Sequence, residues 1–287
     1  MKAIKMGRII DGRKISSQVR EEVNSEVLKL KSRGISIGLA TVMVGADPAS
    51  EIYVGMKHKA CERAGIYSKN YRLDENTSED KLIALVEKLN HDDAVHGILV
   101  QLPLPGHIDR NKAMAAISPE KDVDGFHPVN MGKLLIGEEL LVPCTPKGII
   151  RMLDYEEVDL EGKDTVIINH SPVVGKPLAL MFLNRDATVT VCHVKTKDVK
   201  RYSRDAEILV VAAGVPNLIK EDMVGENSVV IDVGINRVDG KIVGDVDFND
   251  VKNRASLITP VPGGTGPMTI AMLLENTLIA AKMQLNL

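Results

Sequence analysis

A tyrosine and a lysine one helical turn apart are the residues of this sequence best suited to chemistry. The segment around Tyr53 and Lys57 favours a helix, because it opens with the turn-forming pair Asp47-Pro48 and a suitable N-cap, Ser50. A spacing of four residues places both side chains on one helix face. Burial can lower the pKa of a lysine ammonium toward neutrality, and such an amine both accepts and donates protons near pH 7. The pair therefore suggests an acid–base site, although on a half-exposed helix the same two residues also serve ordinary packing.

The composition is that of a globular protein with two domains. The chain has 287 residues, 44% of them hydrophobic, and a formal net charge of -3. With no basic block and only 3% aromatic residues it offers few stacking platforms for bases, so no nucleic acid partner is expected. Its apolar runs fall short of the roughly 18 residues that cross a bilayer, so neither a signal peptide nor a membrane anchor is expected.

The three cysteines suggest neither a disulfide framework nor a metal site. Cys61, Cys144 and Cys192 are odd in number, far apart and without a C-x-x-C pair. We therefore expect no metal and a reducing, cytoplasmic environment.

The first half of the chain alternates strands and helices. An amphipathic helix is expected from Arg13 to Ser32, where apolar residues recur every three or four positions before Gly34. Further elements are expected as strands at 37–44, near 71 and at 96–102, and as a helix at 77–90. This alternation predicts right-handed βαβ units with a parallel sheet, whose ligands gather beyond the carboxyl ends of the strands.

Two short motifs near that sheet edge are ambiguous in isolation. Gln101-Leu-Pro-Leu-Pro105 ends a strand, because two prolines cannot continue a ladder, and it leaves a side-chain amide at the strand end, either as a cap or as a ligand. Asp122-Val-Asp124-Gly125 contains an Asp-Gly pair that is typical of turns and also compatible with a binding site.

A second α/β unit is expected after the domain change near Pro143-Cys-Thr-Pro146. Its predicted helix covers 147–153, and its predicted strands cover 165–168, 188–192, 208–213 and 229–233. The first strand-to-helix turn, 169–177, reads NHSPVVGKP and lacks the G-x-G-x-x-G fingerprint. We expect Asn169 to supply the left-handed conformation of the first glycine, Ser171 to offer a hydroxyl and the helix N-terminus to bind phosphate. From this turn alone, cofactor binding and a plain structural turn both stay open.

The segment Thr259–Thr269 combines three glycines with three prolines. Such a loop is stiff and exposes backbone N–H groups, which suits a ligand lid, while an interdomain connector is the alternative. From Met268 a final helix is expected, with an apolar stripe that returns to the first domain.

Seven motifs in this order give the chain its resemblance to the bifunctional methylenetetrahydrofolate dehydrogenase/cyclohydrolase family, nearly end to end. The motifs are Ser50-x-x-Tyr53-Val-x-x-Lys57-x-Lys59, Val100-Gln-Leu-Pro-Leu104, Pro119-Glu-Lys-Asp-Val-Asp-Gly125, Pro143-Cys-Thr-Pro146, Val233-Gly-Ile-Asn236, Gly244-Asp-Val246 and Thr259-Pro-Val-Pro-Gly-Gly-x-Gly-Pro-Met-Thr269.

The resemblance implies two α/β domains and two consecutive reactions. Residues 1–145, completed by the helix 268–287, would form a parallel-sheet, folate-binding catalytic domain, and residues 146–267 a Rossmann-like NADP-binding domain. The enzyme would oxidise 5,10-methylenetetrahydrofolate with NADP and hydrolyse the methenyl product to 10-formyltetrahydrofolate. It would act as a cytoplasmic homodimer in the one-carbon metabolism that supplies purine, histidine and methionine biosynthesis.

The resemblance also implies a role for individual residues. Lys57 would be the acid–base group, Gln101 would hydrogen-bond to it and tune it, Tyr53 would stack on the pterin, and Asp124 would bind the pterin nitrogens. Further substrate contacts would come from Val100, Leu102, Pro262, Gly263 and Gly266. Cofactor contacts would come from Asn169, His170, Ser171, Val194, Lys195, Thr196, Ala213, Gly214 and Ile235.

The sequence departs from the family where the choice of cofactor is made. Many members have Gly-Arg-Ser where this chain has Asn169-His170-Ser171, which removes a guanidinium suited to a 2′-phosphate. After the second strand, however, no carboxylate precedes Asp198 to hold a ribose diol, while Lys195 supplies positive charge and Thr196 a hydroxyl. We therefore expect NADP rather than NAD.

Three rival readings remain. Tyr-x-x-x-Lys is also the catalytic pair of short-chain dehydrogenases, but here Tyr53 precedes the candidate nucleotide turn by more than a hundred residues. A monofunctional methylenetetrahydrofolate dehydrogenase and a non-catalytic nucleotide sensor on the same fold are the other two.

Overall fold

The structure is a computed structural model that describes residues 7–287. The chain folds into two compact units, which are described separately. The first unit comprises residues 17–144 and 270–287, and the second comprises 145–269 together with the described residues before Ser17. Residues 7–16 thus belong to the second unit, which the sequence pattern did not indicate.

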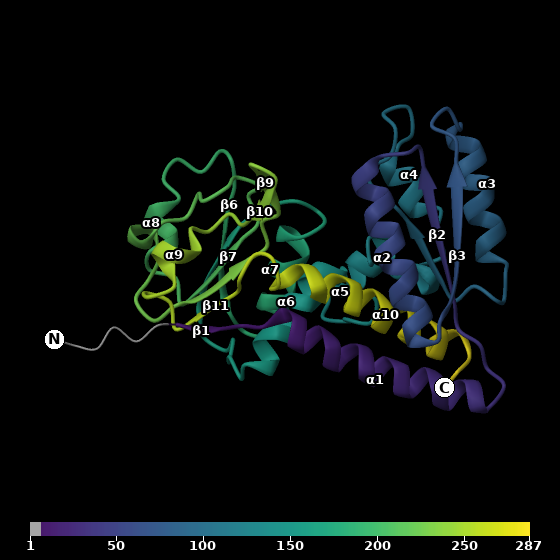
Figure 1. The fold of residues 1–287 in the computed structure, drawn as a ribbon, viewed down its shortest axis with the longest axis horizontal. Coiled ribbons are helices and arrows are strands. Elements are labelled where there is room, and N and C mark those ends of the chain that lie inside the picture. Colours follow the sequence, from purple (N-terminus) through teal and green to yellow (C-terminus); the bar gives the residue numbers. More distant parts are fainter. Residues whose placement is uncertain (1–6) are drawn as a thin grey trace. The chain divides into compact units, whose positions relative to one another are not determined.

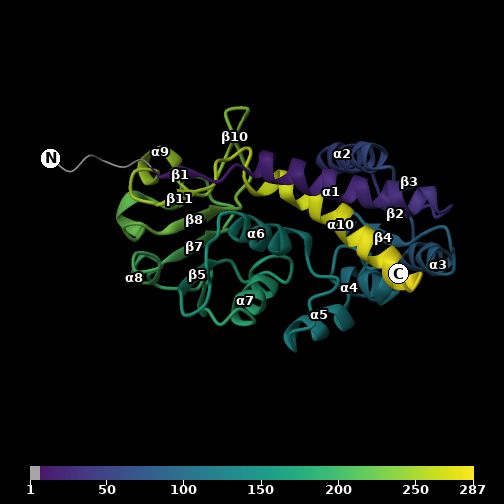
Figure 2. The same cartoon turned by 90° about the horizontal axis from the view of Figure 1, so that it is seen from below.

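The first unit is built on a three-stranded parallel sheet. Its strands lie in the order β3-β2-β4, with bounds Tyr67–Leu73 for β3, Gly38–Val44 for β2 and Gly97–Val100 for β4 (Figure 2). The two apolar strands β2 and β4 are buried throughout, as expected for strands covered on both faces. Strand β3 lies at an edge and alternates between exposed and half-buried positions.

The first unit contains both long and short helices. They are α1 (Gly12–Ser32, beginning in the second unit), α2 (Pro48–Ala64), α3 (Glu79–Asn90), α4 (Arg110–Ala115), the 3-10 turn η1 (Pro119–Lys121), α5 (Pro128–Leu135) and the greater part of α10 (Thr265–Gln284). The helix expected at 77–90 is confirmed as α3, and its residues Leu82, Val86 and Leu89 are buried in one core with residues of β2 and β4.

Helix α10 packs into the first unit beside α1, and both views show the two helices running alongside each other (Figures 1 and 2). The buried Asn276 donates to the carbonyl oxygens of Val123 and Val142, both at 2.9 Å. Near the end of the helix, Lys282 Nζ lies 2.7 Å from Glu26 Oε2 of α1. These contacts tie the loops around residues 123 and 142 to α10.

The second unit is a six-stranded parallel sheet in the order β1-β11-β8-β7-β5-β6. The strand bounds are Arg8–Ile9 (β1), Leu257–Ile258 (β11), Val229–Asp232 (β8), Ile208–Val211 (β7), Asp164–Ile168 (β5) and Thr188–Cys192 (β6). From β5 the chain proceeds to β6 on one side and then to β7 on the other. The crevice beyond this reversal of strand order is where such sheets bind ligands.

Short helices and one hairpin complete the second unit. The remaining bounds are Cys144–Tyr155 (α6), Gly175–Leu183 (α7), Lys200–Ser203 (α8), Glu221–Met223 (the 3-10 turn η2), Asn236–Val238 (β9), Lys241–Val243 (β10) and Phe248–Val251 (α9). Strands β9 and β10 pair with each other in antiparallel fashion. Side chains of β5, β7 and β8 form the core together with Ile219 and Val251.

Candidate active site and nucleotide site

Helix α2 presents the candidate catalytic face. Its N-cap is Asp47, whose carboxylate accepts a hydrogen bond from Ser50 N at 2.8 Å. The expectation that Ser50 caps the helix is therefore wrong: Pro48 occupies the first turn, where a missing N–H costs nothing, and this starts the helix earlier. Ser50 is instead buried, and its hydroxyl donates to Leu102 O at 3.4 Å.

Lys57 and Gln101 are hydrogen-bonded to each other. Lys57 Nζ donates to Gln101 Oε1 at 3.1 Å, and Gln101 Nε2 donates to Leu102 O at 2.7 Å. The backbone N of Gln101 donates to Val42 O, so the residue continues the ladder of β4 by one position. Because the amide group is held at its nitrogen, its oxygen is fixed toward the ammonium. The structure thus brings together two of the predicted site residues, from α2 and from the carboxyl end of β4.

Tyr53 lies one turn before Lys57 on α2, and 40% of its surface is exposed. An aromatic ring on an exposed helix face is available to stack on a planar ligand. Of the neighbouring candidates, Leu102 is half-buried, while the side chain of Val100 is buried in the core. Val100 therefore presents only its backbone to the sheet edge.

A buried carboxylate shapes the loop that carries Asp124. Asp122 accepts hydrogen bonds from Gly125 N at 3.1 Å, from His127 N at 2.8 Å and from Asn130 Nδ2 at 2.9 Å. Gly125 has a φ of 74°, and a Cβ there would lie 2.3 Å from the carbonyl carbon of Val142. The turn thus requires Gly125, and Asp122, which the sequence did not single out, holds the turn in place.

Asp124 lies where its charge is sensitive to Lys57. Burial raises the pKa of the Asp124 carboxyl, and the positive charge of Lys57 acts in the opposite direction. Cys144 Sγ lies 3.9 Å from Asp124 Oδ1. Asp124 therefore belongs to the same cluster as Lys57 and Gln101, and as a carboxylate it can accept hydrogen bonds.

The second unit carries the candidate nucleotide turn, which Asn169 organises with its side chain. Asn169 Oδ1 accepts from Ser171 N at 2.7 Å and from Gly175 N at 3.0 Å, while Nδ2 donates to Ala212 O at 2.6 Å. The expectation of a left-handed Asn169 is wrong, because this residue is absent from the positive-φ residues of the described chain. Its amide instead ties the end of β5 to the end of β7.

Gly175 allows α7 to approach β5 closely. A Cβ at Gly175 would lie 2.0 Å from Asn169 O, so no other residue fits without moving the helix. Close packing of helix on strand is the task of the third glycine in the dinucleotide fingerprint. The turn therefore retains one physical element of that fingerprint, although the G-x-G-x-x-G sequence is absent.

Two histidines lie against each other at the adjacent strand ends. The rings of His170 and His193 have centroids 4.7 Å apart and planes tilted by 31°. His193 N donates to Thr196 Oγ1 at 2.9 Å, and Lys195 N donates to His193 Nδ1 at 3.1 Å. This turn holds the backbone of Lys195 against His193, which in turn packs against His170, and the sequence did not indicate His193. Its only signal was its place immediately after a strand.

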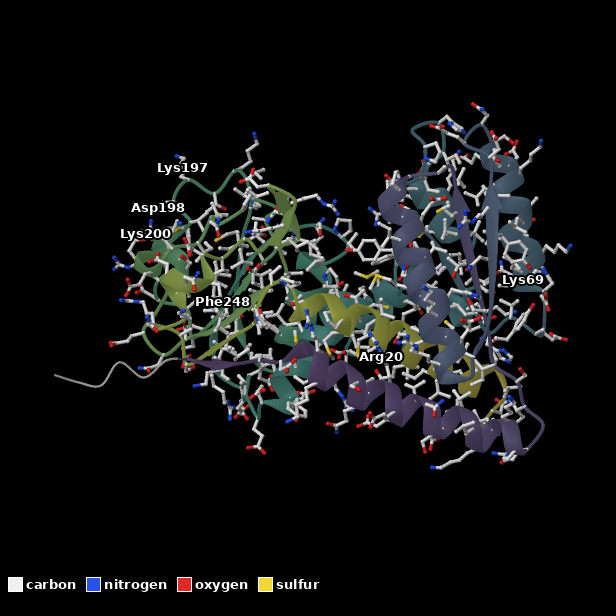
Figure 3. The ribbon with its side chains drawn as sticks, viewed as in Figure 1. Arg20, Lys69, Lys197, Asp198, Lys200 and Phe248 are labelled. Atoms are coloured by element: carbon white, nitrogen blue, oxygen red, sulfur yellow. The ribbon has the colours of Figure 1, made fainter. Side chains whose placement is uncertain are left out.

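The side chains beyond this turn are open to solvent. Val194 is 87% exposed, and His170 and Lys195 are exposed as well. Lys197 and Asp198 project from the outer surface of the second unit (Figure 3). Positively charged side chains thus follow the end of β6, and the sequence has no Asp or Glu between this strand and Asp198.

Two buried aspartates, Asp232 and Asp245, bind backbone N–H groups that follow strands β7 and β8. Asp245 Oδ2 accepts from Ala213 N at 2.6 Å and from Gly214 N at 2.9 Å, so these two N–H groups face the carboxylate rather than a ligand. Asp232 accepts from the backbone N of Gly234, Asp245 and Val246 at 2.9, 3.0 and 2.9 Å. Burial raises the pKa of Asp232 to about 6. This network accounts physically for the motifs Val233–Asn236 and Gly244–Val246, and it leaves Ile235 exposed.

The glycine-rich segment is only partly a loop. Helix α10 begins at Thr265, so the half of Thr259–Thr269 that contains Gly266 is helical. Pro262 and Gly263 precede the helix, and Gly263 has a φ of 116°. Thr259 and Thr265 are tied to Asp232 by hydrogen bonds between hydroxyl and backbone groups. The expected stiffness thus comes from these anchors as well as from the prolines.

Within residues 7–287, no three His, Cys, Asp or Glu side chains are grouped so as to hold a metal ion. None of the helices in the same range has the length and apolar character needed to cross a bilayer.

Comparison with known proteins assigns both parts of the chain. The family model described as tetrahydrofolate dehydrogenase/cyclohydrolase, catalytic domain, matches residues 10–124, and the model of the NAD(P)-binding domain of the same family matches residues 143–285. "Bifunctional protein FolD" of Methanosarcina barkeri is 58% identical over 276 residues, which cover 96% of each chain.

Two solved structures show the same fold. The bifunctional FolD enzyme of Campylobacter jejuni is 55% identical, with a TM-score of 0.95 over 96% of this chain and 99% of that one. The Trypanosoma brucei methylenetetrahydrofolate dehydrogenase-cyclohydrolase, solved with NADP and an inhibitor, is 38% identical, with a TM-score of 0.94 over 99% of this chain and 100% of that one. Catalytic and NAD(P)-binding domains are thus both present, and the chain belongs to the tetrahydrofolate dehydrogenase/cyclohydrolase family.

Proposed function

We propose that one folate site, organised around the Lys57–Gln101 pair, serves both reactions of this bifunctional enzyme. The first reaction oxidises 5,10-methylenetetrahydrofolate to the 5,10-methenyl cation, and the second hydrolyses that cation to 10-formyltetrahydrofolate. The single observation that carries the proposal is the hydrogen bond of 3.1 Å from Lys57 Nζ to an amide oxygen that is itself fixed.

The oxidation step needs orientation more than acid–base chemistry. NADP supplies the acceptor for the hydride that leaves the methylene carbon, so the protein has to hold two rings face to face. Tyr53 is placed to support the flat part of the folate, because its ring is exposed one turn from Lys57. Asp124 supports the pterin as an acceptor for its amino group and ring N–H.

The hydrolysis step requires a proton to be moved twice. Water attacks the methenyl carbon, and a base removes a proton from the attacking oxygen. The bond from that carbon to N5 then breaks, N5 receives a proton, and the remaining hydroxyl proton leaves to solvent as the C=O of the formyl group forms on N10. Lys57 suits both transfers, since its amine can accept the first proton and donate the second. Gln101 holds the amine in place through its oxygen.

We assign NADP rather than NAD to the second unit. Support comes from Lys195, which is exposed beside the His170–His193 pair, and from the hydroxyls of Ser171 and Thr196 in the same two turns. A 2′-phosphate is matched by cations and hydroxyl donors, whereas a ribose diol is matched by a carboxylate. Ser171, Gly175 and Asn169 form a turn into which a cofactor can approach closely.

Assembly and location are proposed on narrower grounds. The family resemblance supports a homodimer, which light scattering on the purified protein tests directly. A reducing cytosol suits Cys61, Cys144 and Cys192, which are buried free thiols.

The test is a paired spectrophotometric assay on the purified protein. NADP reduction that depends on 5,10-methylenetetrahydrofolate measures the dehydrogenase, and decay of added methenyltetrahydrofolate measures the cyclohydrolase. Both activities are expected. Reduction of NADP without enzymatic hydrolysis would show that the protein is a monofunctional dehydrogenase. Nucleotide binding without either activity would show that it is a non-catalytic sensor.

A further inference from the structure

The two peptide groups that flank Asp124 are both held by buried side chains. Before Asp124, the carbonyl oxygen of Val123 accepts a hydrogen bond of 2.9 Å from Asn276 Nδ2. After it, the backbone N of Gly125 donates to Asp122 Oδ1 at 3.1 Å. Each peptide group is planar, so holding the group on either side of a residue restricts its φ and ψ and the direction of its Cα–Cβ bond. Contacts outside Asp124 therefore set the direction of its side chain.

Asn276 holds the Asp124 loop at a second point through a neighbouring segment. Its Nδ2 also donates to the carbonyl oxygen of Val142 at 2.9 Å. Gly125 packs against that segment, since a Cβ at Gly125 would lie 2.3 Å from the carbonyl carbon of Val142. One side-chain amide on α10 thus fixes the peptide before Asp124 and also the segment that supports the residue after it.

An amide is the group that these surroundings require. Two carbonyl oxygens face the Asn276 side chain, and its NH2 group has two protons, one for each acceptor. A leucine of similar volume donates none, and a carboxyl group of the same shape donates one at most. Cys144 Sγ, 3.4 Å from the carbonyl oxygen of Val123, offers only a weak thiol donor in its place. Replacing the amide therefore releases the loop.

We propose that Asn276 is a positioning residue for the folate substrate, which it orients through Asp124. Its side chain is 0% exposed, so it touches no ligand itself. The inference rests on the proposed function, in which the Asp124 carboxylate accepts hydrogen bonds from the pterin. Asn276 sets the direction from which that carboxylate meets the pterin, and small misplacements of such a group weaken binding strongly.

The test measures KM for 5,10-methylenetetrahydrofolate and for NADP in the dehydrogenase assay with Asn276→Leu. We expect KM for the folate to rise about tenfold, with KM for NADP unchanged. Asn276→Asp keeps the shape of the side chain but has at most one proton to donate, so KM for the folate should rise here too. Urea unfolding of both variants shows whether they fold.

Thr277→Val is the matched control. Thr277 is the next residue on α10, is equally buried, and donates its hydroxyl only along the helix, to Leu273 O at 2.7 Å. Valine has nearly the same shape and removes that buried hydrogen bond without touching the Asp124 loop. The control should lose stability toward urea and keep KM for the folate, which separates positioning from a general loss of stability.

A double variant tests whether Asn276 acts through Asp124. In the Asp124→Ala background, Asn276→Leu should raise KM for the folate no further, because the carboxylate that it orients is gone. An equal further rise in this background would overturn the proposal, and so would an unchanged KM for the folate in a folded Asn276→Leu.

If Asn276→Leu fails to fold, Asn276→Asp decides by the same criterion. Failure of the proposed function would look different, because the unmodified enzyme would then not reduce NADP with the folate at all.

Discussion

The buried carboxylate of Asp232 should make the second unit lose stability as the pH rises. Its pKa is raised from 3.8 to about 6 in the folded chain, because burial disfavours the charged form more than three backbone N–H donors favour it. Between those two values the folded state holds a proton that the unfolded state has released. The free energy of unfolding therefore falls with rising pH in that window.

The size of the effect follows from the shift. About two pKa units at 1.36 kcal/mol each give about 3 kcal/mol, fully present below pH 3.8 and lost as the pH rises through 6. Asp232→Asn removes the titration but also places an NH2 group against backbone donors, so the variant is expected to be less stable at every pH.

The assay is urea unfolding from pH 4 to pH 7.5, followed by circular dichroism. The difference in unfolding free energy between the unmodified protein and Asp232→Asn should shrink by about 2–3 kcal/mol from pH 4 to pH 7. This difference isolates Asp232 from other buried carboxyls such as Asp122, which are present in both proteins. A difference that is constant with pH, or that grows, would refute the reasoning.

Three further predictions concern binding. Asp124→Ala should raise KM for folate by about 5- to 150-fold, the loss of a buried acceptor worth about 1–3 kcal/mol, and leave KM for NADP nearly unchanged; equal weakening of both ligands would remove Asp124 from the folate site. Gly175→Ala should destabilise the protein and raise KM for NADP, because its Cβ would lie 2.0 Å from Asn169 O. The control Gly132→Ala on α5 adds a Cβ that meets no atom within 4 Å, so this variant should keep its stability and its KM. Equal stability and equal KM in the two variants would contradict the prediction. Lys195→Ala should lower kcat/KM for NADP by roughly tenfold with little change in kcat/KM for NAD, and His170→Arg should raise kcat/KM for NADP. If the ratio of kcat/KM for NADP to that for NAD stayed unchanged, this turn would not recognise NADP.

The placement of the candidate residues Tyr53, Lys57 and Gln101 was predictable because its signals are local. A four-residue spacing fixes the shared face of Tyr53 and Lys57, and two prolines fix the end of the strand before Gln101. That these two elements meet follows from the parallel sheet, since both lie at the carboxyl ends of β2 and β4. The first residue of α2 was less predictable, because Asp47 and Ser50 are both good N-cap residues. Only the backbone conformation before the helix decides which of them is the cap.

Long-range contacts set the limit of prediction in the second unit. Strands β1 and β11 have two residues each, too few for any periodicity. They exist because β11 pairs with β8 on one side and with β1 on the other. The role of Asn169 has the same origin, because its amide donates a hydrogen bond to Ala212 O, which is distant in sequence. Asp122 and Asp245 are likewise recognisable only once the backbone donors that surround them are known.

The central claim is that Lys57 moves protons for hydrolysis and is dispensable for hydride transfer. Lys57→Met keeps the apolar stem and removes the amine, and Lys88→Met on the exposed face of α3 is the matched control. Both variants are given 5,10-methylenetetrahydrofolate and NADP, and the methenyl intermediate is followed by its absorbance. With Lys57→Met, NADP should be reduced while methenyltetrahydrofolate accumulates, its enzymatic hydrolysis slowed by about 10²- to 10⁴-fold. Hydrolysis at the rate of the unmodified enzyme would contradict the account.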